Sequence, residues 1–133
     1  GLHFALPTEA QWEYAAKGGA NTNYELYAGD GNVLEVAWIE RNSDKSSEVG
    51  MKKPNGLGLY DMSGNVWEMT QDWYYDYSEE AVTDPIGEAY NEGYKVFRGG
   101  SWYTNDQSAR VTARSKQGIH YRDFSTGFRL VIE

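Results

Sequence analysis

Cysteine is absent from the 133 residues of this chain. Disulfide bonds, thiolate metal sites and thiol catalysis are therefore excluded within these residues, because all three need a sulfhydryl group. Because there are no cysteines, the sequence does not indicate whether the protein works in an oxidising or a reducing compartment. An extracellular or cell-surface location is only slightly favoured over the others.

Long apolar runs and positive charge are also scarce. No run approaches the roughly 20 apolar residues that a membrane-spanning helix needs, and residues 1–6 lack the length and the basic flank of a signal peptide. The formal net charge is −8, and such a charge repels phosphate backbones and anionic lipid headgroups. We therefore expect neither a nucleic-acid partner nor membrane insertion. The acidic surplus suits either a calcium ion or plain solubility.

Aromatic residues and glycine are abundant instead. The chain contains 5 Trp, 11 Tyr, 4 Phe and 15 Gly. Aromatic side chains bury large apolar areas, whereas glycines mark turns and close backbone contacts. A chain of this length fits one domain with one core. The composition thus predicts a single loop-rich globular domain over residues 1–133.

The clearest local signal is a helix start. Thr8 can cap a helix, and Gln11 can complete a reciprocal capping box. The apolar residues that follow have helical spacing: Trp12, Ala15 and Ala16. Two glycines then supply a left-handed stop. The pattern predicts a helix over residues 9–17.

Three later segments carry strand signals. Residues 65–69 and 95–98 alternate, and residues 127–132 close the chain on an apolar run. They are expected to form one antiparallel sheet. Residues 20–58 and 74–94 show no sustained period and predict long loops. The aromatic anchors expected in the first loop are Tyr24, Tyr27 and Trp38.

Four ordered stretches carry a family resemblance. They are residues 6–16 (LPTEAQWEYAA), 55–68 (NGLGLYDMSGNVWE), 98–102 (RGGSW) and 127–130 (GFRL). Together they resemble the formylglycine-generating enzyme or sulfatase-modifying factor family over nearly the whole chain. The resemblance implies an α+β, C-type-lectin-like fold with little regular secondary structure. Family members usually carry a further stretch before the first motif.

The segment 61–68 places two carboxylates around a Gly-Asn turn. From spacing alone, two interpretations stay open: a calcium site, or a tight turn capped by Asp61 with Glu68 in a surface salt bridge. The resemblance implies one structural calcium ion, bound by the side chains of Asp61 and Glu68 and by the carbonyls of Gly64 and Val66. A second calcium site near residues 36–44 is not expected, because Val36 offers no side-chain ligand there.

The family's catalytic cysteines have no counterpart in this chain. In catalytic relatives, the resemblance implies two copper-binding cysteines just after the RGGSW-like motif, at positions near Thr104 and near Ser108 or Ala109. Hydroxyl groups do not replace thiolates for Cu(I). We therefore expect no copper and no catalytic residue. His3 and His120 are too few and too far apart to suggest a zinc or iron site.

Residues 103–126 have the composition of an adaptable binding loop, although an ordinary hydrophilic loop is an equal interpretation. Some lectin-fold members of this family are the variable proteins of diversity-generating retroelements, and their diversified segment lies between GGSW-like and GFRL-like motifs. The ligand-binding residues expected here are Tyr103, Asn105, Asp106, His120, Tyr121, Asp123 and Phe124. The residues expected in the core beneath them are Trp102, Val111 and Phe128.

The sequence therefore favours a non-catalytic module that binds a protein or small ligand on a calcium-stabilised scaffold. The alternative is a sulfatase-modifying enzyme or accessory subunit, whose chemistry another segment or a partner would supply. No sugar-specific calcium motif is present, so the expected fold does not by itself predict sugar binding.

Overall fold

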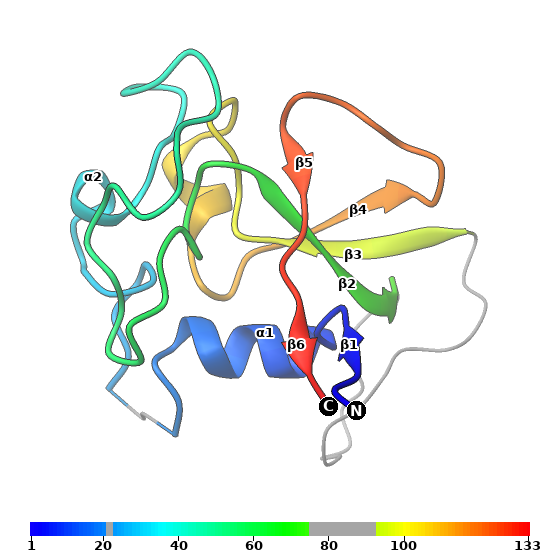
Figure 1. The fold of residues 1–133 in the computed structure, drawn as a ribbon. Helices are drawn as coiled ribbons and strands as arrows, with labels where there is room; N and C mark the ends of the chain where they lie inside the picture. Colours follow the sequence, from blue (N-terminus) through cyan, green and yellow to red (C-terminus); the bar gives the residue numbers. More distant parts are fainter. Residues whose placement is uncertain (21–22, 75–92) are drawn as a thin grey trace.

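The computed structural model describes residues 1–20, 23–74 and 93–133 (Figure 1). Most of the loop predicted at 74–94 lies outside the described residues. Helices and short strands follow one another along the chain in this order: β1 (Phe4–Ala5), α1 (Glu9–Ala16), α2 (Val33–Val36), β2 (Trp67–Trp73), β3 (Tyr94–Arg98), the 3₁₀ helix η1 (Asp106–Ala109), β4 (Arg114–Gly118), β5 (Thr126–Gly127) and β6 (Val131–Ile132). None of the described helices is long and apolar enough to cross a membrane.

Helix α1 forms where the capping signal predicts it. The backbone N–H of Gln11 donates to Thr8 Oγ1 over 3.1 Å, and the N–H of Thr8 donates to Gln11 Oε1 over 3.0 Å. This capping box satisfies two N–H groups at the helix start. Trp12 and Ala16 are buried on the inner face. The predicted helix is confirmed, with its end one residue earlier than expected.

The main sheet is mixed rather than antiparallel. Its order is β4-β3-β2-β5; β2 and β4 run antiparallel to β3, whereas β5 runs parallel to β2. The predicted strand at 65–69 begins at Trp67, because Asn65 has a left-handed φ of 66° that an extended strand excludes. The expectation of one antiparallel sheet was wrong.

The closing segment 127–132 divides between two sheets. Its start belongs to β5, and its end forms β6, which pairs with β1 as a separate antiparallel ribbon. Figure 1 shows the two chain termini close together at the end of this ribbon. Phe128, Arg129 and Leu130 connect the two strands, so the apolar run does not continue as one strand.

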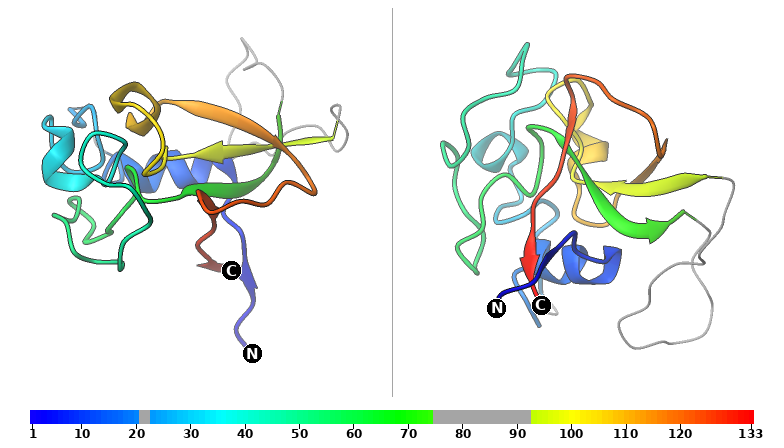
Figure 2. Two further views of the ribbon diagram at one scale, coloured as in Figure 1. Left: turned by 90° about the horizontal axis from the view of Figure 1, so that it is seen from above. Right: turned by 45° about the vertical axis from the view of Figure 1, so that its right-hand side comes forward.

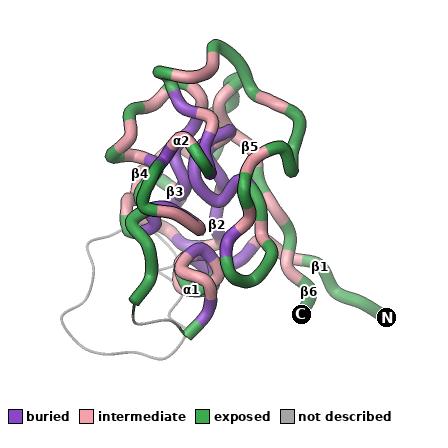
Figure 3. Tube along the Cα trace, turned by 90° about the vertical axis from the view of Figure 1, so that its left-hand side faces the viewer, coloured by how far each residue is buried: buried purple, intermediate pink, exposed green. Residues whose placement is uncertain are grey.

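The core lies between α1, the sheet and the packed loops. One cluster joins Tyr27 and Ile39 to the inner side of α2, and another joins Trp12 and Met62 to Val111. Figure 3 shows buried residues concentrated along β2 and β3, whereas β1 and β6 are exposed or half-buried. Of the three anchors expected in the first loop, Tyr27 is buried, Trp38 is half-buried and Tyr24 is exposed.

A buried ion network fastens α1 to the sheet. The guanidinium of Arg98 is fully buried and donates to Glu9 over 2.8 Å and to Glu13 over 2.6 Å. Arg114 of β4 reaches the same Glu9 carboxylate over 2.7 Å. Gly99 and Gly100, which directly follow Arg98, have positive φ values of 99° and 71°. The RGGSW motif therefore serves packing, as its paired glycines suggest.

Candidate functional site

The segment 61–68 forms one wall of a pocket of about 400 Å³. Asp61, Val66 and Glu68 line the pocket, whereas Gly64 does not. Gly64 has a φ of 77°, and a Cβ at this position would overlap the backbone of Trp38. The Gly-Asn turn is therefore pressed against the preceding loop. Both carboxylates lie at the pocket, and the Gly64 side of the turn packs on Trp38.

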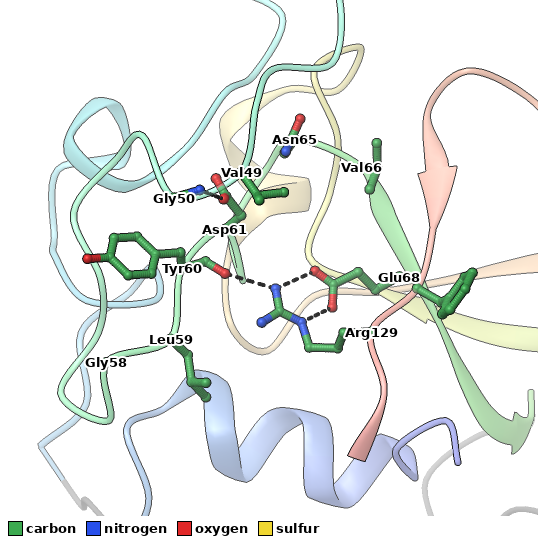
Figure 4. A pocket seen from close by; sticks show the side chains of 11 residues that line it. Val49, Gly50, Gly58, Leu59, Tyr60, Asp61, Asn65, Val66, Glu68 and Arg129 are labelled. Atoms are coloured by element: carbon green, nitrogen blue, oxygen red, sulfur yellow. Dashed lines mark hydrogen bonds and ion pairs between the residues drawn. The ribbon is translucent and has the colours of Figure 1, made fainter. Parts of the chain in front are cut away.

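Asp61 presents one unpaired carboxylate oxygen. The residue is buried, and its Oδ2 accepts a hydrogen bond of 2.9 Å from the backbone N–H of Gly50. Its Oδ1 is buried without a hydrogen-bond partner. An unpaired buried carboxylate oxygen is costly, so this atom is a natural acceptor for a cation or a donor from outside. Figure 4 shows Asp61 beside Gly50 at the pocket.

Glu68 is paired with Arg129 from the end of the chain. Arg129 Nε donates to Glu68 Oε1 over 2.5 Å, and Arg129 Nη2 donates to Oε2 over 2.8 Å (Figure 4). The indole N–H of Trp12 donates to the same Oε1 over 2.9 Å. Burial alone would lower the pKa of Arg129, but the hydrogen bond and charge of Glu68 and the charge of Asp61 raise it above its usual value. Arg129 therefore stays a cation here.

The donor atoms at the pocket fit part of the calcium site that the resemblance implies. Asp61 Oδ1 is free, and Glu68 Oε2 accepts one hydrogen bond, which leaves it one further lone pair. Glu68 Oε1 already accepts two hydrogen bonds. In residues 1–20, 23–74 and 93–133, no three or more His, Cys, Asp or Glu side chains are grouped so that they could hold a metal ion. A calcium ion here would thus depend on two carboxylates together with carbonyls and water.

At the positions that correspond to the family's cysteines, Thr104 is hydrogen-bonded and Ala109 is buried. Thr104 Oγ1 donates to the carbonyl of Ser101 over 3.0 Å and accepts from its N–H over 2.8 Å. Ala109 is fully buried at the end of η1, while Ser108 is half-buried within it. These side chains stabilise the turn before η1 and offer no thiolate to a soft metal.

The segment 103–126 is not one loop. Its middle contains η1 and β4, and β4 pairs with β3 at five consecutive positions, from Arg98↔Arg114 to Tyr94↔Gly118. The sequence missed β4 because its residues, RSKQG, are polar and do not alternate. The two ends of the segment, residues 103–105 and 119–124, are loops in which every residue but Thr104 is exposed.

Six of the seven expected ligand-binding side chains lie on these two loops, and the seventh, Asp106, begins η1. Tyr103 is 72% exposed, Phe124 is 90% exposed and Tyr121 is 44% exposed. Asn105, His120 and Asp123 are also exposed, whereas Asp106 is half-buried and pairs with Arg41 over 2.9 Å. The structure therefore leaves six of the seven side chains accessible.

Of the three side chains expected in the core beneath these loops, one is buried. Val111 is buried as expected, and Trp102 is half-buried. Phe128 is 65% exposed, so its placement in the core was wrong. The reason is the neighbouring Arg129, whose side chain turns inward to Glu68. Successive side chains of an extended segment point to opposite sides, so Phe128 faces outward.

A hydrogen bond joins the two exposed loops. The indole N–H of Trp102 donates to the carbonyl of Phe124 over 3.0 Å, and the Tyr103 ring packs edge-on against Trp102 with centroids 5.4 Å apart. The Asp123 carboxylate accepts from the backbone N–H of Ser125 over 2.8 Å and from the hydroxyl of Tyr121. This last hydrogen bond, helped by desolvation, raises the pKa of Tyr121 above its usual value. Bonds of this kind hold the backbone under the exposed aromatic rings.

Sequence reasoning missed the contribution of Arg129. An arginine inside the otherwise apolar closing run is a weak signal that this position faces an acidic partner. The identity of that partner could not be read from spacing, since Glu68 lies 61 positions earlier in the chain. Arg129 also donates to the carbonyl of Tyr60 over 2.9 Å, so one side chain connects three segments at the pocket.

Comparison with known proteins places the chain among sulfatase-modifying relatives. The family model described as "Sulfatase-modifying factor enzyme 1-like domain" matches residues 3–133. The formylglycine-generating enzyme of Streptomyces coelicolor is 37% identical, over 93% of this chain and 45% of that enzyme. The chaperone protein LppX of Paenibacillus barcinonensis is 32% identical, over 96% of this chain and 49% of that protein. The chain thus spans about half the length of these curated relatives.

Solved structures agree with this result. Treponema denticola variable protein 1 superposes with a TM-score of 0.85 and 38% identity, over 96% of this chain and 46% of that protein. PvdO from Pseudomonas aeruginosa superposes with the same TM-score at 24% identity, which supports the fold alone. The expected α+β fold of the formylglycine-generating-enzyme type, with little regular structure, is thereby confirmed, and the chain belongs to the sulfatase-modifying factor enzyme 1-like domain family.

Proposed function

We propose that this chain is a non-catalytic binding module that presents residues 103–105 and 119–124 to a protein or small ligand. The observation that carries the proposal is a pair of exposed aromatic residues on an anchored backbone. Phe124 is 90% exposed, yet its carbonyl is held by the Trp102 indole, and the exposed Tyr103 packs on the same indole. Exposed aromatic rings on a held backbone supply large contact area at a low entropic cost, as in other adaptable binding surfaces.

The similarity to Treponema denticola variable protein 1 supports this proposal, because it extends over 96% of the chain at 38% identity. We further propose that residues 103–126 are a diversified segment. In that case, substitution should concentrate at exposed positions such as Tyr103 and Phe124. It should spare Val111 and the strand β4, since both are part of the scaffold.

Sequencing the locus in related isolates tests the diversified segment. We expect a nearby reverse transcriptase gene, a second copy of the coding sequence for residues 103–126, and changes concentrated at the exposed positions. Changes spread evenly over exposed and buried positions, with no second copy, would contradict this part of the proposal.

Calcium binding at the pocket is the second part of the proposal. Asp61 and Glu68 would hold the ion with side-chain oxygens, and Gly64 and Val66 with their carbonyls. Support comes from Asp61 Oδ1, which is buried without a partner. Bound calcium would neutralise this oxygen and tie the turn at 61–68 to the sheet. Since no position is implied where a substrate would enter the coordination shell, the role is structural.

Thermal unfolding with calcium or chelator tests this site. At a calcium concentration 100 times the dissociation constant, binding to the native state alone adds about 2.7 kcal/mol. For a chain of this length, that corresponds to a rise in melting temperature of about 10 °C.

Asp61→Asn should abolish the rise with little effect in chelator, because the hydrogen bond from Gly50 is kept. Asp44→Asn, an exposed residue with the same change in charge, is the control and should keep the rise. A wild-type chain that melts at the same temperature in calcium and in chelator would contradict the proposal.

Glu68→Gln separates the two functions of this carboxylate. The substitution weakens the pairing with Arg129, so it should destabilise the chain in chelator by about 2 kcal/mol. It should also remove most of the calcium response. If the calcium response of Glu68→Gln equals that of the wild type, then Glu68 is not a ligand.

A sulfatase-modifying enzyme or accessory subunit is the second candidate, favoured by the 37% identity to the Streptomyces enzyme. Within this chain no thiol is available to hold copper or to be oxidised. We therefore expect no oxygen uptake above a no-protein control when the chain is mixed with copper and a cysteine-containing sulfatase peptide. Formylglycine formed above that control would favour the enzyme over the binding module.

A further inference from the structure

The two exposed loops offer a partner cations rather than carboxylates. The segment that holds both loops contains two acidic residues, Asp106 and Asp123, and both already have partners within the chain. Asp106 accepts hydrogen bonds of 3.0 and 2.9 Å from Arg41. Asp123 accepts hydrogen bonds of 2.8 Å from the N–H and from the hydroxyl of Ser125, and another from the hydroxyl of Tyr121. These two carboxylates therefore have little capacity left for a donor on a partner.

Arg122 and His120 lie on the second loop without a partner. Both residues are exposed, and neither side chain makes a hydrogen bond or an ion pair with any part of the chain that the structure describes. Figure 1 and Figure 2 show the stretch between β4 and β5, which carries them, at the outside of the molecule. A guanidinium group presents its N–H donors in a planar fork that matches a carboxylate. The second loop thus presents a cation that can pair with an anionic group.

The negative net charge of the chain does not oppose this pairing. Six acidic residues and no basic residue lie in 75–92, so the rest of the chain accounts for only −2 of the net charge of −8. Beside the first loop lies the exposed Glu40, whose backbone N–H donates to the carbonyl of Thr104 over 3.0 Å. Arg122 belongs to the second loop, and at 0.1 M salt the field of a distant charge fades beyond about 10 Å. The total charge thus disfavours an extended polyanion, whereas a single carboxylate can still reach Arg122.

Aromatic rings lie next to this cation on the loop. Phe124 is 90% exposed and Tyr121 is 44% exposed, while the hydroxyl of Tyr121 donates to Asp123. A cation beside exposed rings complements a peptide that carries an acidic side chain next to an apolar one. On the basis of the binding function proposed above, we propose that the partner is a protein with an acidic peptide segment. A carboxylate of this segment pairs with Arg122, and a neighbouring apolar side chain packs on Phe124.

A library of phage-displayed random peptides, selected on the immobilised chain, tests the chemistry of the partner. We expect Asp and Glu to be enriched at least about twofold over the unselected library. A synthetic copy of a selected peptide then gives dissociation constants by fluorescence polarisation. Arg122→Gln should weaken binding by at least about fivefold, because it removes a charge-assisted hydrogen bond.

Arg110→Gln is the matched control for this substitution. Arg110 is an exposed arginine outside the two loops, and its side chain has no partner among the described residues. Its replacement should change the dissociation constant by less than about twofold, since it removes the same charge away from the proposed contact.

Charge reversal makes the test specific to the ion pair. Arg122→Glu should bind a peptide whose acidic residues are replaced by Lys at least about fivefold more tightly than the wild type does. Because the Arg122 side chain has no partner among the described residues, both Arg122 variants should melt within about 2 °C of the wild type. Selected peptides that are neutral or basic, or equal binding by the wild type and Arg122→Gln, would overturn the proposal.

A double variant, Tyr103→Ser with Phe124→Ser, separates this inference from the binding function on which it rests. We expect the double variant and Arg122→Gln both to weaken binding. If the double variant loses binding while Arg122→Gln keeps it, the loops bind a partner but the acidic segment is wrong. If the double variant binds as tightly as the wild type, or if no peptide is enriched over the bare support, both the loop surface and the acidic partner are overturned.

Discussion

Replacement of Arg98 by methionine should produce a large loss of stability. Arg98 is fully buried, its guanidinium pairs with Glu9 and Glu13, and it also donates to the carbonyl of Val111. Arg98→Met keeps the length of the side chain but leaves both carboxylates without this cation. Breaking a buried pair on one side costs about 3–5 kcal/mol.

The lower end of this range applies, because both carboxylates keep another partner. Glu9 stays paired with Arg114, and Glu13 stays paired with Lys17 at 2.6 Å. A loss of about 3 kcal/mol, divided by an unfolding entropy of about 0.28 kcal/mol/K for 133 residues, lowers the melting temperature by about 11 °C.

Thermal unfolding followed by circular dichroism at pH 7 measures this difference, with Arg41→Met as the matched control. Arg41 is also ion-paired, but on the surface, where it makes a bidentate pair with Asp106 at 3.0 and 2.9 Å. Exposed pairs contribute about 0–1 kcal/mol, so the control should lower the melting temperature by less than about 4 °C. If the two variants melt at the same temperature, the reasoning from the buried network is refuted.

Three further predictions test the scaffold and the loops. Gly100→Ala should cost at least about 2 kcal/mol in urea unfolding, because φ is 71° and the added Cβ would lie 2.9 Å from the backbone of Ser108; a cost below about 0.5 kcal/mol would contradict this packing. Burial alone would raise the pKa of Glu13, but the hydrogen bond with Lys17 and the charge of Arg98 lower it. The stability that this ionised carboxylate adds is therefore present above about pH 4.5 and is lost as the pH falls through the folded pKa, so the difference between the wild type and Glu13→Gln should shrink from pH 6 to pH 3. Replacing Tyr121 and Phe124 together by Ser should cost only about 1 kcal/mol by calorimetry, because Phe124 is 90% exposed and Tyr121 is 44% exposed; a loss above about 3 kcal/mol would show that these rings belong to the core.

Features that depend on neighbouring residues could be predicted from the sequence alone. The capping box of α1 joins Thr8 to Gln11, three positions apart, so its chemistry is visible in the local sequence. The adjacent glycines of the RGGSW motif likewise suggested a close backbone contact, and a Cβ at Gly100 would indeed lie 2.9 Å from the backbone of Ser108. The four ordered motifs identified the family and its fold, and the missing cysteines showed that this chain carries no thiol chemistry.

Features that depend on distant residues were decided only by the tertiary structure. Glu68 pairs with Arg129, which lies 61 positions later in the chain, and Arg98 pairs with Glu9, which lies 89 positions earlier. No local pattern specifies such partners, since packing of the sheet on α1 brings them together. The same holds for strand direction: β5 lies parallel to β2 because the loop before it returns the chain to that edge of the sheet. Strand β4 likewise forms from a polar sequence because β3 offers a free edge, and this pairing divides the expected binding segment into two loops.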